Sequence, residues 1–281
     1  MLNPEDFKRA IQAIDALGAT PTVLVQVAEL ARDPNTDLTT MCELLRKDGP
    51  LSADLIRISN SPYYSPATFH GNLTSAVGQI GLREVNRVVN LSLSRQIFAR
   101  DLSGYGVSAQ DYWSESIAAA LLMEALAKHA GLNPEDAYTI GILHTIGRVL
   151  INRVIGERGF SIFWDGHHPV EEWERETVGF DYAEAGAMLL EHWRFPMPTC
   201  DVIRWQLNPE KVVEPASLLG ALQFTRRLLG LTGLDFAKQN WQVPEADLFM
   251  KTSGLTLAGA SQIISTCREE FQRIRQSVDV T

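Results

Sequence analysis

The sequence predicts an all-α protein, and two observations support this prediction. Along most of the chain, apolar residues recur at spacings of three and four, which is the period of an amphipathic helix. No stretch shows the regular polar and apolar alternation that several neighbouring strands of a sheet would require. We therefore expect a multi-helical array with two lobes, built from about a dozen helices of ordinary length.

The composition is that of a globular protein with an acidic balance. Of the 281 residues, 45% are hydrophobic and 21% are charged, which permits a large core and excludes wholesale disorder. The formal net charge of −9 argues against nucleic acids and anionic membranes as partners, because both require a basic face. The three cysteines fit neither a disulfide framework nor a zinc-binding spacing. The N-terminus shows no signal pattern, and the apolar runs are too short to span a bilayer. We therefore expect a cytoplasmic protein.

The first hundred residues predict an N-terminal lobe, residues 1–101. Helical spacing covers six short stretches: 4–17, 23–31, 38–47, 52–59, 73–80 and 85–98. Asp48, Gly49 and Pro50 are expected to separate the third stretch from the fourth. A short amphipathic helix is not stable alone in water, so these stretches must bury their apolar stripes against one another.

Within this lobe, residues 60–72 combine turn formers with the aromatic residues Tyr63, Tyr64 and Phe69. Large aromatic side chains on such a loop can anchor a partner protein, because they bury much area at modest entropic cost. They can equally hold an ordered connection against the lobe. We name these three residues the candidate interaction loop and leave both interpretations open.

Residues 109–230 predict a second helical lobe, which a glycine- and serine-containing joint at 102–108 separates from the first. The stretch 112–130 is apolar on nearly all sides and predicts a central helix enclosed by protein. Further helices are expected at 133–154, 181–193, 200–206 and 218–229, with irregular connections at 156–168 and 230–244. Residues 231–281 are expected to form a C-terminal extension that packs on the body and carries a last helix at 255–274.

The helix at 133–154 is expected to organise the second lobe. Asn133 can cap its N-terminus, and its apolar residues lie along one stripe. His144 lies on this stripe and should point inward, where an imidazole needs a hydrogen-bond partner or a metal. A satisfied core histidine is the commoner of these two outcomes.

Five motifs occur together along the chain: 55–64 (LIRISNSPYY), 74–89 (TSAVGQIGLREVNRVV), 113–118 (WSESIA), 141–147 (GILHTIG) and 184–190 (EAGAMLL). In this order and at these separations they resemble the HDOD domain, the HD-related output domain of bacterial signalling proteins. The resemblance covers about residues 15–230. It implies an all-helical fold in which the second lobe is similar to the HD-type metal-dependent phosphohydrolases.

The chain departs from the metal-binding pattern that the resemblance implies. In catalytic HD proteins, histidines and aspartates from several helices hold divalent metals that activate water against a phosphoester. The matching positions here form a degenerate HD pocket, which we treat as a candidate ligand site: Glu115, His144, Thr145, Tyr182, Trp205 and Gln206. Only His144 and Glu115 could ligate a metal, and two ligands do not make such a site. The other side chains can fill and hydrogen-bond the space.

The resemblance and these replacements predict a non-catalytic signalling module that acts by binding a protein partner or a small ligand. We expect no catalytic residue, no metal and no cofactor. The alternative is a divergent metal-dependent phosphohydrolase with phosphodiesterase-like chemistry.

Overall fold

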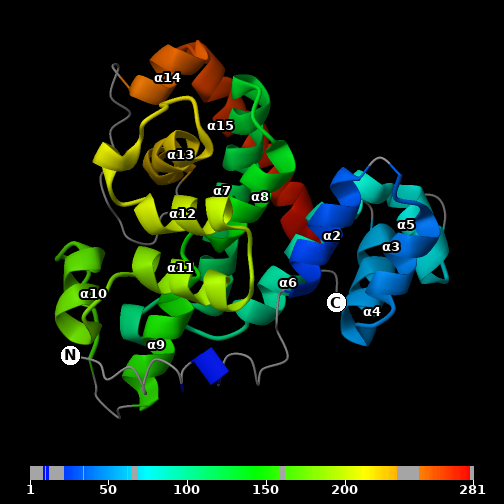
Figure 1. Cartoon of the computed structure of the whole chain (residues 1–281), viewed down its shortest axis with the longest axis horizontal. Helices are drawn as coiled ribbons and strands as arrows, with labels where there is room; N and C mark the ends of the chain where they lie inside the picture. Colours follow the sequence, from blue (N-terminus) through cyan, green and yellow to red (C-terminus); the bar gives the residue numbers. More distant parts are fainter. Residues whose placement is uncertain are drawn as a thin grey trace.

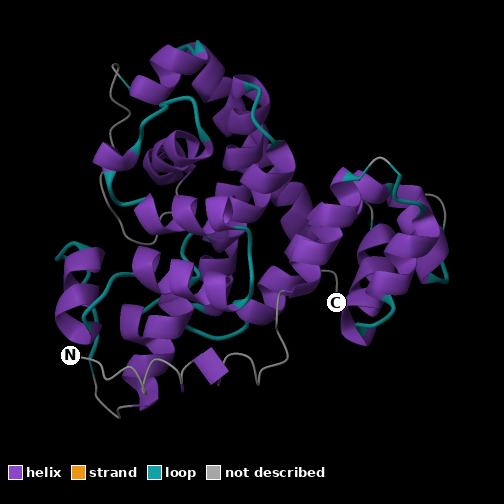
Figure 2. Ribbon diagram, in the orientation of Figure 1, coloured by secondary structure: helices purple, strands orange, loops and turns teal. Residues whose placement is uncertain are grey.

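The computed structural model describes residues 9, 11–12, 22–33, 35–61, 63–64, 69–157, 162–232 and 247–278. Within these ranges the regular secondary structure is helical, and one isolated β-bridge pairs Leu102 with Val107. Figure 2 shows helices throughout and no strand among the described residues. The all-α prediction is confirmed.

The N-terminal helices lie close to where the sequence predicts them. They are α2 (Thr22–Arg32), α3 (Leu38–Leu45), α4 (Gly49–Ser59), α5 (Leu73–Ile80) and α6 (Leu82–Ile97). One boundary differs, because Gly49 and Pro50 form the first turn of α4 instead of separating it from α3. Proline is tolerated there, since the first N–H groups of a helix have no intrahelical partner. The predicted helix at 4–17 lies mostly outside the described residues.

The predicted central helix is α7 (Ala109–Ala130), and the Ser108 side chain caps it. Fourteen of its 22 residues are buried. Its uniform apolarity requires this enclosure, because a helix that is hydrophobic on all sides must be surrounded by protein. The prediction of a central buried helix is therefore confirmed.

The expected joint at 102–108 is a compact turn. It contains η1 (Ser103–Tyr105), and the Gly104 N–H donates to Asn152 Oδ1 at 2.9 Å. Tyr105 is buried, with 4% of its surface exposed. The segment thus packs against the body of the second half, and the lobe boundaries at residues 101, 109 and 230 remain predictions.

In the described residues from 162 onward, seven more helices follow. They are α10 (Val170–Val178), α11 (Tyr182–His192), α12 (Met197–Trp205), η2 (Pro209–Lys211), α13 (Leu218–Thr232), α14 (Leu248–Ser253) and α15 (Leu257–Val278). Helices α10 and α14 were not predicted from the sequence. Asp181 and Glu184 form a capping box at the start of α11. Residues 233–246, most of the expected irregular connection, lie outside the described residues.

The stretch 133–154 forms two helices joined by a turn at 144–146, so the prediction of one continuous helix is wrong. The helices are α8 (Pro134–Leu143), which Asn133 caps as expected, and α9 (Gly147–Glu157). Directly after the break, α9 approaches α11 closely. A Cβ atom on Gly147 would lie 2.0 Å from Tyr182 O, so only glycine allows the two backbones to come this near.

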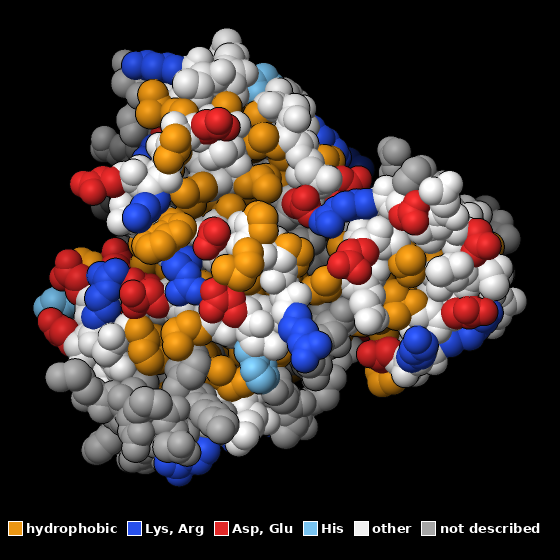
Figure 3. Space-filling model, in the orientation of Figure 1, with side chains coloured by type: hydrophobic (Ala, Val, Ile, Leu, Met, Phe, Trp, Pro, Cys, Tyr) orange, Lys and Arg blue, Asp and Glu red, His pale blue; other side chains and the backbone are white. Residues whose placement is uncertain are grey.

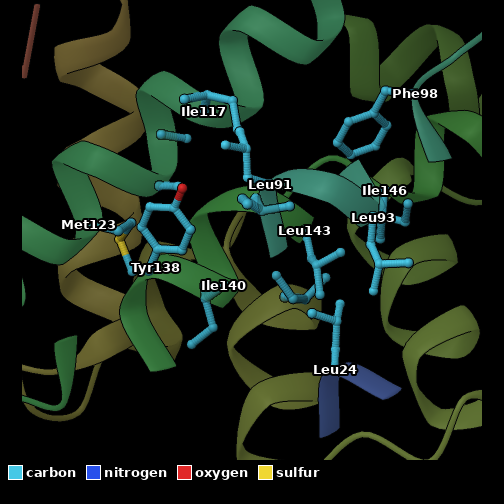
Figure 4. Close-up of a cluster of buried hydrophobic side chains, with 14 of the residues drawn as sticks. Leu24, Leu91, Leu93, Phe98, Ile117, Met123, Tyr138, Ile140, Leu143 and Ile146 are labelled. Carbon is cyan, nitrogen blue, oxygen red and sulfur yellow. The ribbon is translucent and has the colours of Figure 1, made fainter. Parts of the chain in front are cut away.

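The hydrophobic core is continuous from the N-terminal helices into the second half. Figure 1 shows α3, α4 and α5 set to one side of the larger group of helices. Helix α6 packs on α2 and α4, and it also packs on α7 and α8. Figure 4 shows side chains of α2, α6 and α8 in one cluster, among them Leu24, Leu91 and Leu143. This shared core holds α7 and α8, and with them the turn at 144–146, in place.

Gly147→Ala tests the close packing of α9 on α11. We expect it to lower the free energy of unfolding by about 3 kcal/mol, because the added methyl group overlaps the backbone of α11 and forces the helices apart. Urea unfolding measures the change. Gly156→Ala in the same helix is the matched control, since its Cβ meets no heavy atom within 4 Å. The control should leave stability equal or raise it by up to about 1 kcal/mol. Equal stability of the two variants would contradict the packing argument.

Candidate functional site

The predicted pocket residues lie around the turn between α8 and α9. Five of them come from four parts of the chain: one from α7, two from the turn, one from the start of α11 and one from the position after α12. In this order they are Glu115, His144, Thr145, Tyr182 and Gln206. All five are buried, with 4% of Glu115 exposed and 1% of each of the others. Elements that are far apart in the sequence therefore form one enclosed polar site.

An arginine that the sequence analysis did not single out lies at the centre of this site. Arg148, in the first turn of α9, has only 3% of its surface exposed. Its Nη1 is 3.9 Å from Glu115 Oε1, and its Nε is 3.7 Å from Glu174 Oε1. Its guanidinium carbon lies 4.1 Å from the ring centroid of Tyr182 and 6.0 Å from that of Tyr105. Two carboxyl groups and two aromatic rings thus surround the buried cation and offset part of the cost of burying it.

Hydrogen bonds fix the turn that carries His144. Its Nδ1–H donates to Gly141 O at 2.7 Å. The His144 carbonyl accepts from Gln206 Nε2 at 2.7 Å, and the Thr145 carbonyl accepts from the Tyr112 hydroxyl at 2.6 Å. His144 therefore carries its proton on Nδ1 and a lone pair on Nε2. A neutral histidine in this tautomer can ligate a metal through Nε2.

Glu174 is the second carboxylate at the site and comes from α10. The residue is completely buried. Its Oε2 accepts the Tyr182 N–H at 2.7 Å, and its Oε1 accepts the Tyr105 hydroxyl at 2.9 Å. Glu174 therefore ties α10 and η1 to the start of α11 as well as facing Arg148.

Burial favours the neutral forms of two groups at this site. It lowers the pKa of His144 to about 3, and the charge of Arg148 adds to this shift. Burial raises the pKa of Glu174 to about 7, although Arg148 and two hydrogen bonds oppose the rise. His144 is consequently neutral at pH 7 and adds no second positive charge beside Arg148.

Two features of the pocket differ from expectation. Trp205 is half-buried, and its ring centroid lies 4.5 Å from the ammonium nitrogen of Lys211. The hydrogen bonding is also incomplete, because Thr145 Oγ1 and Gln206 Oε1 are buried without a hydrogen-bond partner in the described part of the chain. The replacements fill the space but satisfy only part of its polar atoms.

The donor set does not fit the divalent-metal site of the catalytic HD proteins. Glu115 and His144 could each offer one ligand, and Glu115 Oε1 lies 3.8 Å from His144 Nε2, but Arg148 Nη1 lies 3.9 Å from the same carboxylate oxygen. A guanidinium here repels a second cation and takes up the oxygen atoms that the metal would need. In the described ranges, no three His, Cys, Asp or Glu side chains gather as a metal site requires. The Arg148 guanidinium thus lies beside the two side chains that could ligate a metal.

The candidate interaction loop divides into anchored and exposed residues. The Tyr63 hydroxyl donates to Glu270 of α15 at 2.9 Å, and the Tyr64 hydroxyl donates to Glu84 of α6 at 2.8 Å. Phe69, in contrast, is 82% exposed. The two tyrosines support the interpretation as an ordered connection, whereas Phe69 is accessible to a partner.

The raised pKa of Glu174 predicts a loss of stability as the pH rises. Between pH 4.5 and about 7 the unfolded chain has released this proton while the folded protein still holds it, so the free energy of unfolding falls with increasing pH. His144 acts in the opposite direction between pH 6.5 and about 3. Glu174→Gln should remove the first contribution, which urea unfolding at several pH values from 5 to 8 measures.

Glu172→Gln is the matched control, because Glu172 is an exposed residue of the same helix. Its pH profile should follow that of the unmodified protein. If Glu174→Gln and the unmodified protein show the same slope from pH 5 to 8, the buried carboxyl does not carry the effect.

Comparisons with known proteins agree with this architecture. A family model of the HDOD domain matches residues 17–209. An HDOD domain protein with unknown function from Geobacter sulfurreducens has a TM-score of 0.70 at 21% identity, with 92% of this chain and 91% of that chain covered. A protein from Shewanella amazonensis SB2B, provisionally named a phosphohydrolase, has a TM-score of 0.64 at 23% identity, with 95% and 97% covered.

Two further relatives are longer than this chain. A protein from Marinobacter aquaeolei VT8, provisionally named a signal transduction protein, has a TM-score of 0.70 at 20% identity, with 97% of this chain and 64% of that chain covered. An uncharacterized protein of Treponema pallidum (strain Nichols) is 23% identical over 218 residues, which are 75% of this chain and 42% of that protein. The chain thus spans less than half the length of this curated relative. The solved structures show the fold, and because the family model matches more than half of the sequence, the chain belongs to the HDOD domain family.

Proposed function

We propose that this HDOD chain is a non-catalytic signalling module that acts by binding a protein partner or a small ligand, and that Arg148 replaces the metal of catalytic HD proteins. The observation that carries the proposal is the buried guanidinium in contact with Glu115 and Glu174. Hydrolysis of the HD type needs a metal-activated water at this place. An arginine supplies positive charge but no open coordination position, so it cannot generate such a nucleophile.

The charges of the site are balanced around this fixed cation. A buried charge without partners would lower the free energy of unfolding by about 3–5 kcal/mol. Arg148 has one carboxylate at 3.9 Å and another at 3.7 Å, and the ring of Tyr182 covers its face. The pocket therefore needs no added metal for its stability, which supports a structural role for the former catalytic centre.

One observation favours the alternative, a divergent metal-dependent phosphohydrolase. His144 donates its Nδ1–H to a backbone carbonyl, as metal-ligating histidines commonly do. Before a divalent ion could reach Nε2, however, Arg148 would have to leave its carboxylate partners. Breaking a buried ion pair costs about 3–5 kcal/mol, so the non-catalytic interpretation is preferred.

The surface supports a protein or a small ligand as the binding partner. Figure 3 shows acidic and basic side chains interspersed over the drawn face, without an extended basic area. The net charge of −9 likewise disfavours a nucleic-acid backbone. None of the helices in the described ranges combines the length and apolarity that a bilayer span requires. Phe69 is the best candidate for an aromatic contact, because it is exposed on a loop of the N-terminal helices.

The purified protein should contain no stoichiometric iron, manganese or zinc and should not hydrolyse bis-p-nitrophenyl phosphate or cyclic dinucleotides. Elemental analysis and product chromatography measure these two properties. Thr145→Asp alone should restore neither, because Arg148 still occupies the site. Thr145→Asp combined with Arg148→Ala returns one ligand and removes the cation, so it should bind more Mn²⁺ than either single variant. Stoichiometric metal with hydrolysis that His144→Ala abolishes would instead establish the phosphohydrolase.

Phe69→Ala should leave the protein folded and change the free energy of unfolding by less than about 0.5 kcal/mol, since the side chain is exposed. Tyr64→Phe removes one half-buried hydrogen bond to Glu84 and should cost about 1 kcal/mol. Partner recovery is measured for both variants beside their stability. Loss of a partner only with Phe69→Ala supports binding through the loop, whereas unfolding of that variant would make Phe69 a core anchor.

A further inference from the structure

The C-terminal helix α15 is attached far less extensively than the central helix of equal length. Helices α7 and α15 both contain 22 residues, and 14 are buried in α7. In the described part of α15, four side chains are buried: Ala260, Cys267, Phe271 and Ile274. These positions form a single narrow stripe, which packs on α7 and α13. A helix with so few buried side chains is expected to open locally at a lower free energy than a central helix.

A polar cluster fastens this helix to the N-terminal half. Arg87 of α6 forms an ion pair with Glu270 of α15. The same Glu270 carboxylate accepts the Tyr63 hydroxyl at 2.9 Å. Figure 1 shows α15, in red, running behind α7 and α8 towards the N-terminal helices. One glutamate of α15 therefore connects the C-terminal helix to both α6 and the loop that follows α4.

This attachment depends on one guanidinium that three carboxylates share. Besides Glu270, Arg87 lies 3.7 Å from Glu84 and 3.8 Å from Glu124 of α7. Only 15% of the Arg87 side chain is exposed, and its guanidinium carbon lies 5.3 Å from the ring centroid of Tyr138. The carboxylates repel one another, so loss of the contact with Arg87 would leave Glu270 near like charges and weaken its place in the cluster.

We propose that α15 is a releasable strap: it opens from α7 as a local unit when the contact between Arg87 and Glu270 is lost, while the rest of the fold stays intact. Opening uncovers Arg87, Tyr63 and the face of α7 that α15 covers. The protein thereby has two surface states, which is the property that a signalling module without catalysis requires. This inference concerns the surface and does not depend on the chemistry of the pocket at His144.

Native-state amide hydrogen exchange of the full chain tests the proposal directly. Under conditions in which exchange follows the opening equilibrium, amides of residues 260–276 should exchange at least about tenfold faster than those buried in the middle of α7. Low concentrations of urea should speed the exchange of these residues less than that of α7, because opening α15 exposes less surface than global unfolding does. Equal protection of α15 and α7 would overturn the proposal, since α15 would then open only with the whole protein.

Glu270→Gln and Glu269→Gln form a matched pair on the same helix. Glu269 is 67% exposed and pairs only locally with Arg273 in the contacts that the structure gives it. Glu270→Gln should lower the protection of α15 by about a further tenfold, the value expected for a charged hydrogen bond, and leave α7 unchanged. Glu269→Gln should change neither helix. Loss of protection in α7 and α15 together, or no loss in either, contradicts the strap.

The outcome is separable from that of the proposed function. Metal content and hydrolysis depend on Arg148 and His144, which neither glutamate variant contacts. If the exchange experiment contradicts local opening of α15, the proposal that the protein is non-catalytic is unaffected. If metal-dependent hydrolysis is found, the proposal about α15 is unaffected. If Glu270→Gln does not fold, the measurement on the unmodified protein still decides.

Discussion

One buried cation joins five elements of the second half. The Arg148 guanidinium contacts carboxylates from α7 and α10 and rings from η1 and α11, so four elements besides its own helix converge on it. In a low-dielectric interior such a charge is tolerated only with its partners, because each partner removed leaves an uncompensated ion. The elements around the turn at 144–146 are therefore held together by electrostatics as well as by apolar packing.

Periodicity predicts the N-terminal helices well because α3, α4 and α5 each bury one stripe, whereas α7 was predicted from its uniform apolarity. Asn133 and Asp181 cap their helices as their sequence contexts indicate. The break at 144–146 could not be predicted in this way, since the apolar spacing continues through it on both sides. The contact of Gly147 with Tyr182 O, which depends on a helix 35 residues later in the chain, cannot be read from the sequence either.

The candidate site was predictable in part. The family-like motifs locate the residues around the turn, but they contain neither Arg148 nor Glu174, the two charges that define its electrostatics. A signal was present for each: Arg148 follows His144 by four positions on the apolar stripe, and Glu174 lies midway between Val170 and Val178. A charge on an apolar stripe indicates a buried ion. Which ions meet is a matter of tertiary structure, because α9 and α10 are separated in sequence by a connection without helical period.

Packing alone requires the two glycines near the turn, which limits what a family motif says about chemistry. Gly141 and Gly147 are required because a Cβ would lie 2.5 Å from Ala120 Cα at the first and 2.0 Å from Tyr182 O at the second. Neither requirement involves a metal or a phosphoester. A lineage can thus exchange every reactive group at the turn and still keep the spacing of the motif, because close backbone contact preserves it. Similarity in this motif therefore reports the shape of the scaffold, and the chemistry has to be judged from the residues between the glycines and just after them.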